Sequence, residues 1–190
     1  IVNGKTEKIK SASQAIQCGV ALVPADRKRQ GLMLELSNRH NLAVSSMKKR
    51  MNGPFIDQKA ETSFAEDMVK RLSIKLGGLE LPVSSLSGGN QQKIVLGKEL
   101  ATEPKVILFD EPTRGIDVAA KVEIYNLMNQ LKQNGIGVMF VSSEMPEVMG
   151  MSDRIIVMCD GRITGELSAE EATQDMILTK ATQFEQKTAL

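Results

Sequence analysis

A short apolar run that ends in two acids constrains the fold of this chain more than any other segment. Val106 to Phe109 are consecutive apolar residues, and Pro104 stands just before them. Such a run is typical of a strand buried on both faces of a parallel sheet. Asp110 and Glu111 follow at once, at the strand end where open α/β sheets bind ligands. The run therefore predicts an α/β fold with a ligand site at this end.

The two acids suit phosphoryl transfer. An aspartate such as Asp110 can hold Mg²⁺ through water, because Mg²⁺ prefers oxygen ligands and keeps part of its water shell. A glutamate such as Glu111 can orient or deprotonate an attacking water. The alternative is that both acids only cap the next helix, and an Asp-Glu pair taken alone favours that alternative.

A glycine-rich turn precedes the acids by about twenty residues. In the string LSGGNQQK, residues 86–93, Ser87 stands before Gly88 and Gly89, and an apolar-periodic stretch follows. A serine there indicates a helix N-cap, and glycines let a phosphate approach the backbone. Free amides and the helix dipole favour an anion at such a turn. An ordinary capped helix is the alternative for Ser-Gly-Gly alone, but both strings in this order favour a nucleotide-dependent ATPase.

The chain resembles the ATPase domain of ATP-binding-cassette transporters, in particular the monosaccharide-importer branch. Five strings carry this resemblance over nearly the whole chain: GVALVPADRKRQGL, LSGGNQQK, DEPTRGID, VSSEMPEV and SDRIIVMCDGRITGE. Members of that branch energise uptake of ribose, galactose, xylose, arabinose or related compounds such as autoinducer-2. One polypeptide of the branch carries two cassette domains, and this chain is most similar to the second. We therefore expect a C-terminal fragment of a longer ATPase subunit, or a truncated gene product.

The resemblance implies a shared mechanism in which two cassette domains sandwich ATP. The signature turn, residues 87–89, would cover the γ-phosphate held by a partner domain, while the acids would serve a second nucleotide. Glu111 is the expected catalytic residue, and Asp110 would bind Mg²⁺ through water in a complete domain. The expected nucleotide-binding residues are Ser87, Gly88, Gly89, Asn90, Asp117 and Ser143. Asp117 has an equally good alternative as a plain helix cap.

The phosphate-cradling P-loop, GxxxxGK followed by Ser or Thr, does not occur in residues 1–190. Gly4-Lys5-Thr6 imitates its end, but the alternating residues that follow favour a hairpin with a turn at Asn3-Gly4. Lys5 is therefore no site candidate. We expect the fold of a P-loop NTPase-like cassette domain that lacks its P-loop.

Two positions depart from the usual pattern of the family. Ser143 matches the histidine that contacts the γ-phosphate, and a hydroxyl cannot carry the imidazole's charge. Ala25 or Asp26 replaces the usual glutamine after the strand at residues 20–23. The importer branch shows such departures in its second domain. They leave open whether this chain hydrolyses ATP, and the alternative is a degenerate docking or regulatory half that only completes its partner's ATP site.

The implied partners are a second cassette domain, transmembrane permease subunits and, indirectly, a periplasmic sugar-binding protein. The implied place is the cytoplasmic side of the inner membrane, as a peripheral protein. A net charge of +1 and an aromatic content of 3% give no reason to expect nucleic acid. Cys18 and Cys159 lack a CxxC spacing and are expected to be reduced thiols. His40 is expected at the surface, neither ligand nor base.

Alternating helix and strand patterns organise the chain as one partial cassette domain. The predicted strands lie at residues 20–23, 105–110 and 137–141, and a hairpin lies at 154–159 and 162–166. The predicted helices lie at residues 13–17, 38–50, 57–72, 90–101 and 118–133, and a last helix starts at Ser168, where Glu171 completes a capping box. Residues 26–31 are expected to form a charged loop, residues 36–85 a small helical subdomain, and residues 182–190 a frayed tail.

Two other protein families are alternatives, and the sequence speaks against both. A chromosome-maintenance or repair ATPase should show a long coiled coil, and no heptads are sustained here. A soluble cassette protein of translation does not suit the Asn90-Gln91-Gln92-Lys93 string or the SSEMPE string.

Overall fold

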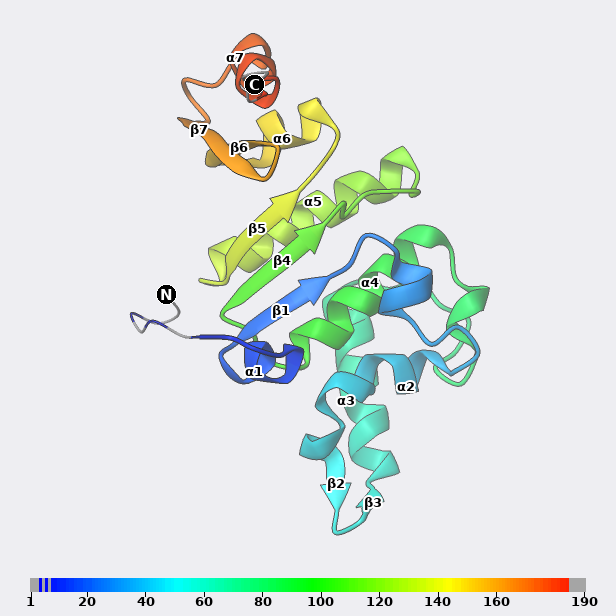
Figure 1. The fold of residues 1–190 in the computed structure, drawn as a ribbon. Helices are drawn as coiled ribbons and strands as arrows, with labels where there is room; N and C mark the ends of the chain where they lie inside the picture. Colours follow the sequence, from blue (N-terminus) through cyan, green and yellow to red (C-terminus); the bar gives the residue numbers. More distant parts are fainter. Residues whose placement is uncertain (1–3, 5, 7, 185–190) are drawn as a thin grey trace. The chain divides into compact units, whose positions relative to one another are not determined.

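The computed structural model describes residues 4, 6 and 8–184, which form two compact units that divide after Val141 (Figure 1). The Asn3-Gly4 turn, Lys5 and most of the predicted tail lie wholly or partly outside the described residues. The hairpin expected at the start and the frayed end therefore stay predictions.

The first unit is built on a parallel sheet of β1 (Val20–Val23), β4 (Val106–Asp110) and β5 (Gly137–Val141), in the order β1-β4-β5. Leu22 pairs with Leu108, and Leu108 with Met139, so the rows of side chains run straight across the sheet. The predicted α/β fold with a parallel core is confirmed. Because β4 lies in the centre, its C-terminal end is flanked by the ends of both neighbours.

The two faces of this sheet differ. On one face Ala21, Val23, Ile107 and Phe109 are buried, and the helices α4 (Gly88–Leu100) and α5 (Val118–Gln133) contact β1 and β5. On the other face Leu22, Met139 and Val141 are 52%, 54% and 55% exposed. Burial on both faces was predicted for residues 106–109, and it holds only in part: Ile107 and Phe109 are buried, whereas Val106 and Leu108 on the second face are half-buried.

The helical part of the first unit follows β1 and departs from one prediction. Its elements are α2 (Asn38–Ala43), the 3₁₀ stretch η2 (Val44–Arg50), β2 (Met51–Asn52), β3 (Phe55–Ile56) and α3 (Gln58–Arg71). The single helix predicted over residues 38–50 is wrong, because Ser46 leaves helical geometry at φ −129° and ψ 23°. The predicted break at Asn52-Gly53-Pro54 is confirmed, and it forms the turn of a short β2–β3 hairpin with Gly53 at φ +61°.

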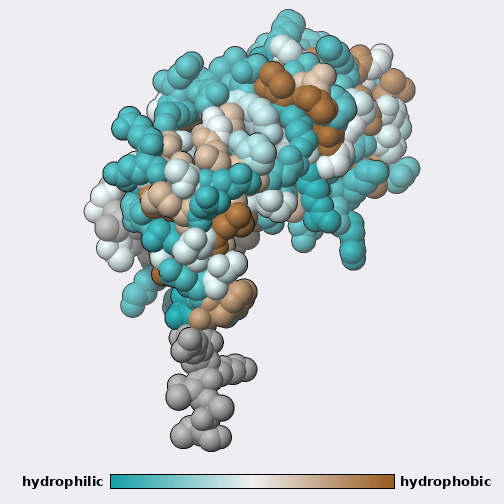
Figure 2. All heavy atoms as spheres, turned by 90° about the horizontal axis from the view of Figure 1, so that it is seen from above, coloured by the Kyte–Doolittle hydropathy of each residue, from teal (hydrophilic) through white to brown (hydrophobic). Residues whose placement is uncertain are grey.

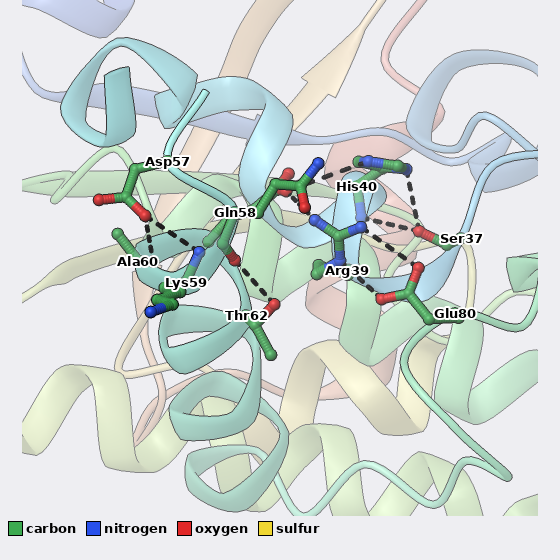
Figure 3. Close-up of polar contacts among 10 residues, drawn as sticks. Ser37, Arg39, His40, Asp57, Gln58, Lys59, Ala60, Thr62 and Glu80 are labelled. Carbon is green, nitrogen blue, oxygen red and sulfur yellow. Dashed lines mark hydrogen bonds and ion pairs between the residues drawn. The ribbon is translucent and has the colours of Figure 1, made fainter. Parts of the chain in front are cut away.

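An ion-pair cluster joins the segments of this helical part (Figure 3). Arg39 Nε and Nη2 donate to the two carboxylate oxygens of Glu80 at 2.7 and 3.2 Å, and Nη1 contacts the buried Glu61. These hydrogen bonds lower the pKa of Glu80. His40 is not a free surface residue: its Nδ1 lies 3.0 Å from Ser37 Oγ, and its ring is 44% exposed. His40 thus lies partly at the surface, as predicted, and adds a contact to this cluster.

Three short elements complete the first unit: α1 (Ala12–Gln17), η1 (Arg27–Gly31) and the 3₁₀ turn η3 (Val83–Ser85). The predicted charged loop at residues 26–31 is wrong in form, since η1 is one turn of π-helix. Asp26 begins it, and its carboxylate accepts from Arg29 N at 3.1 Å. This turn carries Arg27 directly after β1.

The second unit contains α6 (Met145–Met151), β6 (Arg154–Cys159), β7 (Arg162–Ser168) and α7 (Gln174–Ala181). Its core is made of Ile155, Val157, Leu167 and Ile177. The predicted hairpin is confirmed, with Asp160 and Gly161 both at positive φ in its turn.

The predicted last helix starts in the wrong place. Ser168 Oγ accepts from Glu171 N at 3.3 Å, but this bond closes only a turn, and Ala169 N is held by Asp153 O at 3.0 Å. The helix α7 begins later, after Thr173, whose hydroxyl accepts from Met176 N. The serine and glutamate at this three-residue spacing therefore close a turn but do not begin a helix.

The face drawn in Figure 2 is mostly hydrophilic, with small separate hydrophobic patches. Across residues 4, 6 and 8–184, no helix has both the length and the apolar character needed to cross a membrane. Cys18 and Cys159 are both free thiols, and Cys159 is buried.

Candidate functional site

The signature turn opens α4, and its serine does not do what the sequence predicted. Ser87 occupies the N-cap position at φ −63° and ψ 158°, but its hydroxyl makes no capping bond to the backbone. The hydroxyl instead accepts from Asn90 Nδ2 at 2.9 Å, and Asn90 Oδ1 accepts from Lys75 N at 2.8 Å. The Ser87 hydroxyl therefore does not cap the helix backbone, and the first amides of α4 have no side-chain cap. Such amides favour an anion.

The two glycines of the turn are closely packed, and Gly89 has no room for a side chain. A Cβ on Gly88 would lie 2.8 Å from Arg27 Nη2 and 3.2 Å from Gly115 O. A Cβ on Gly89 would lie 2.5 Å from the Cβ of Ala120. The glycines thus let the start of α4 pack directly against the start of α5 and the segment before it.

That segment is the Asp117 loop, residues 114–117. Gly115 has φ +68°, a conformation that favours glycine, and Asp117 accepts from Ala120 N at 2.9 Å. The helix-cap alternative for Asp117 is thus observed, and a second role toward nucleotide stays a prediction. The structure brings Ser87, Gly88, Gly89, Asn90 and the Asp117 loop together, although the two strings lie some twenty residues apart.

Arg27 also belongs to this site, and the sequence reasoning assigned it no role. Its Nη1 donates to Arg114 O at 2.8 Å and its Nη2 to Gly115 O at 3.1 Å. Burial lowers its pKa, which Asp26 partly offsets. A depression of about 280 Å³ lies beside it, lined by residues 25–28, Arg114 and Gly115. The only sequence signal was its place inside the string GVALVPADRKRQGL.

The acids stand at the end of β4, apart from any helix cap. Asp110 is exposed, and Glu111 takes φ +48°, which is strained for a residue with a side chain. Glu111 N donates to Val141 O at 2.9 Å, and Arg114 N donates to Glu111 O at 3.1 Å. The chain turns sharply at Glu111 through this backbone conformation. No sequence pattern predicted the conformation. The alternative that the acids only cap the next helix is wrong, because Asp117 caps α5.

The remaining candidates are Ser143, Ala25 and Asp26. Ser143 is exposed and belongs to the second unit, two residues beyond β5. Its neighbour Ser142 accepts from Glu144 N at 3.0 Å and donates to Glu147. Ala25 and Asp26 lie after β1, where Asp26 caps η1.

The donor set agrees with a nucleotide and its magnesium more than with a resident metal. Among the described residues, no three or more His, Cys, Asp and Glu side chains cluster as a metal site. Asp110 would hold Mg²⁺ only as one oxygen ligand beside phosphate and water, as Mg²⁺ usually does. The uncapped amides of α4 and the hydroxyl of Ser87 fit a phosphate.

Comparison with known proteins identifies the family. The family model described as "ABC transporter" matches residues 2–114. The chain belongs to the ABC transporter family. Its relatives include a xylose import ATP-binding protein of Moorella thermoacetica, 52% identical over 95% of this chain and 36% of that protein. A ribose import ATP-binding protein of Oceanobacillus iheyensis is 50% identical over 96% of this chain and 37% of that protein.

These relatives agree with the importer branch that the sequence resembles. A ribose import ATP-binding protein of Bacillus subtilis is also 47% identical, over 95% of this chain and 37% of that protein. The chain thus spans little more than a third of the length of these curated relatives. The resemblance to the ATPases of sugar importers is confirmed.

Solved structures confirm the fold. An ATP-binding cassette solved as a dimer with ADP and phosphate in a post-hydrolysis state matches 89% of this chain and 72% of its own, with a TM-score of 0.71 and 22% identity. A second cassette of an ABC transporter matches 88% of this chain and 70% of its own, with a TM-score of 0.70 and 22% identity. The fold class is that of a cassette ATPase domain.

Proposed function

We propose that this chain supplies the signature half of a composite ATP site in the ATPase of a carbohydrate importer. ATP hydrolysis in that assembly drives uptake of a monosaccharide or a related compound. The observation that carries the proposal is the start of α4, where the first amides have no side-chain cap, the Ser87 hydroxyl is held by Asn90, and Gly88 and Gly89 keep the backbone accessible. A phosphate held by a partner cassette domain can approach such a surface closely.

The acids at the end of β4 would act at a second nucleotide. Asp110 would hold Mg²⁺ through water, and Glu111 would orient the attacking water. Asn90 would position Ser87 at the partner's ATP. Asp117 would add a further nucleotide contact, and Ser143 would contact phosphate at the second nucleotide. The strained backbone at Glu111 supports a functional role there, because such strain persists at sites where a fixed side-chain direction matters.

The permease is the proposed membrane partner, and the helical subdomain at about residues 36–85 is its proposed contact. Phe55 at the β2–β3 hairpin is 75% exposed, and Met51 and Met47 are 43% and 39% exposed. Exposed apolar residues gathered on one hairpin and its neighbour favour a protein contact. In this arrangement the chain lies at the cytoplasmic side of the membrane, and a periplasmic sugar-binding protein delivers the substrate. Phe55→Ser should therefore weaken co-purification with the permease.

A second candidate is a docking or regulatory half that completes its partner's ATP site but hydrolyses nothing itself. Serine at position 143, in place of the family's usual histidine, favours it. Both candidates need the signature turn and differ in what Glu111 does.

The test uses the importer reconstituted in proteoliposomes, with ATP turnover and ribose or xylose uptake as readouts. The Ser87→Ala/Gly88→Asp double variant places a like charge and bulk where the phosphate must approach. Loss of a positioned donor costs about 10²–10³ in rate, and we expect a loss of that size. Gly150→Asp is the control, because a Cβ on Gly150 meets nothing within 4 Å. Unchanged turnover in the double variant would show that the turn is only a helix start.

A further inference from the structure

The guanidinium of Arg27 joins three segments that are distant in the sequence. It is carried by η1 after β1, and it donates to Arg114 O and Gly115 O, 87 and 88 residues further along the chain. Its Nη2 also lies against the position where a Cβ of Gly88 would stand, at 2.8 Å. The group therefore lies between the start of α4 and the Asp117 loop.

The base of Arg27 is itself held on α4. A Cβ on Gly31 would lie 2.9 Å from Val95 Cγ2, so η1 packs directly on that helix. Lys98 Nζ donates to Gly31 O at 2.6 Å. Figure 1 shows η1 and α4 side by side, and the two are in contact. Arg27 thus reaches the Asp117 loop from a support that is fixed to the same helix as the signature turn.

The fork of the guanidinium fits this task. Two parallel N–H donors satisfy two successive carbonyls, which sets both the distance and the orientation of the loop. The Nε of Arg27 is buried without a hydrogen-bond partner among the described residues. A lysine ammonium is a compact charge and cannot reproduce the fork.

We propose that Arg27 is a positioning residue that sets the spacing between the signature turn and the Asp117 loop, and so pre-organises the half-site that covers a partner's ATP. This inference rests on the proposed function of the turn. Arg27 acts through the backbone at residues 88 and 114–115 and does not itself touch nucleotide. Placement errors of about 1 Å can cost up to roughly 10²-fold in rate, so spacing alone is enough to matter.

The first experiment needs only residues 1–190. Hydrogen exchange is compared between the parent chain and Arg27→Gln, with Arg29→Gln as the matched control on the exposed side of the same turn. We expect roughly tenfold faster exchange in Arg27→Gln at the amides of Arg114 and Ile116, which donate to Glu111 O and Thr113 O, and no change in residues 124–131 of α5. Arg27→Lys should fall between the two, and it serves as the readout if Arg27→Gln does not fold. Unchanged exchange at residues 114–117 overturns the inference.

The second experiment uses the reconstituted importer and separates the inference from the proposed function. Arg27→Gln should lower kcat on the order of tenfold and leave KM for ATP nearly unchanged, because binding rests on the partner's phosphate cradle. Gly88→Asp is measured in parallel. If Gly88→Asp abolishes turnover and Arg27→Gln leaves kcat unchanged, the inference is wrong. If both leave kcat unchanged, the proposed function is wrong.

Discussion

The two halves of the candidate site are built in opposite ways. The start of α4 packs closely on distant segments: a Cβ on Gly88 would lie 2.8 Å from Arg27 Nη2, a Cβ on Gly89 would lie 2.5 Å from the Ala120 Cβ, and Asn90 bonds both Ser87 Oγ and Lys75 N. The end of β4 has one strained residue, Glu111, and one exposed acid, Asp110. The first half is thus shaped by close packing between distant segments, whereas the second is shaped by the backbone at Glu111, whose N donates to Val141 O.

The uncovered face of the sheet agrees with this contrast. Leu22, Met139 and Val141 are more than half exposed on the face that α4 and α5 do not cover. Parallel sheets in α/β proteins usually have both faces covered. The start of α4 lies on the covered face, among closely packed helices. Substitutions there should therefore have larger effects than substitutions of the acids.

Among the changes that act through packing or positioning alone, the largest effect is expected at Gly89, where an added Cβ would meet the Cβ of Ala120. Gly89→Ala places a methyl 2.5 Å from the Ala120 Cβ, so α4 and α5 must separate. Overpacking costs about 1–3 kcal/mol, and the shifted turn should lower ATP turnover of the importer by about 10²-fold. Gly89→Ala combined with Ala120→Gly restores the packed volume. Thermal unfolding and ATPase rates check both variants, and failure of the second change to restore turnover would contradict the packing explanation.

A smaller effect is expected at Asn90, which holds the Ser87 hydroxyl. Asn90→Ala removes both side-chain bonds, and we expect turnover to fall by roughly tenfold through loss of positioning. Asn90→Asp separates the two bonds, because aspartate still accepts from Lys75 N but cannot donate to Ser87. Steady-state ATPase assays distinguish the variants. Equal turnover in Asn90→Asp and the parent would show that the bond to Ser87 has no part in catalysis.

A still smaller effect is expected from Glu111→Gln in the complete ATPase subunit. The resemblance matches Ser143 to the family's histidine that contacts phosphate, and on that proposal hydrolysis at this nucleotide is already weak. We expect turnover to change by only about two- to threefold, against near-abolition by the equivalent change in the other cassette domain. ATP turnover by both variants is the measurement. The reverse result would mean that this half is the active one and would break the comparison.

The smallest expected signal is the heat of Mg-ATP binding to residues 1–190. The amides that cradle a nucleotide's phosphates come mainly from a P-loop, and no such motif occurs in these residues. Isothermal calorimetry should therefore show no binding at micromolar concentrations. Micromolar affinity would show that the acid half is complete without that motif.

Local pattern predicted most of the elements because each carries its own signal. The apolar runs at β1, β4 and β5 and the periodic helix α5 were predicted to within a residue. Errors arose where a local signal had a competing use. Ser168 caps a turn instead of a helix, and Ser46 interrupts a stretch that has no glycine or proline. The site was half predictable, since both motif strings were evident, but Arg27 and the strain at Glu111 were not.

By itself, the sequence determined the fold class, the family and the two strings that meet at the start of α4. Only the tertiary structure decided that Asn90, and not the backbone, engages the Ser87 hydroxyl, and that Arg27 spans to residues 114–115. The physical reason is the separation in sequence between the groups that interact. Periodicity and capping are set by residues within a few positions of one another, whereas a bond across 87 residues exists only after the sheet and α4 have packed.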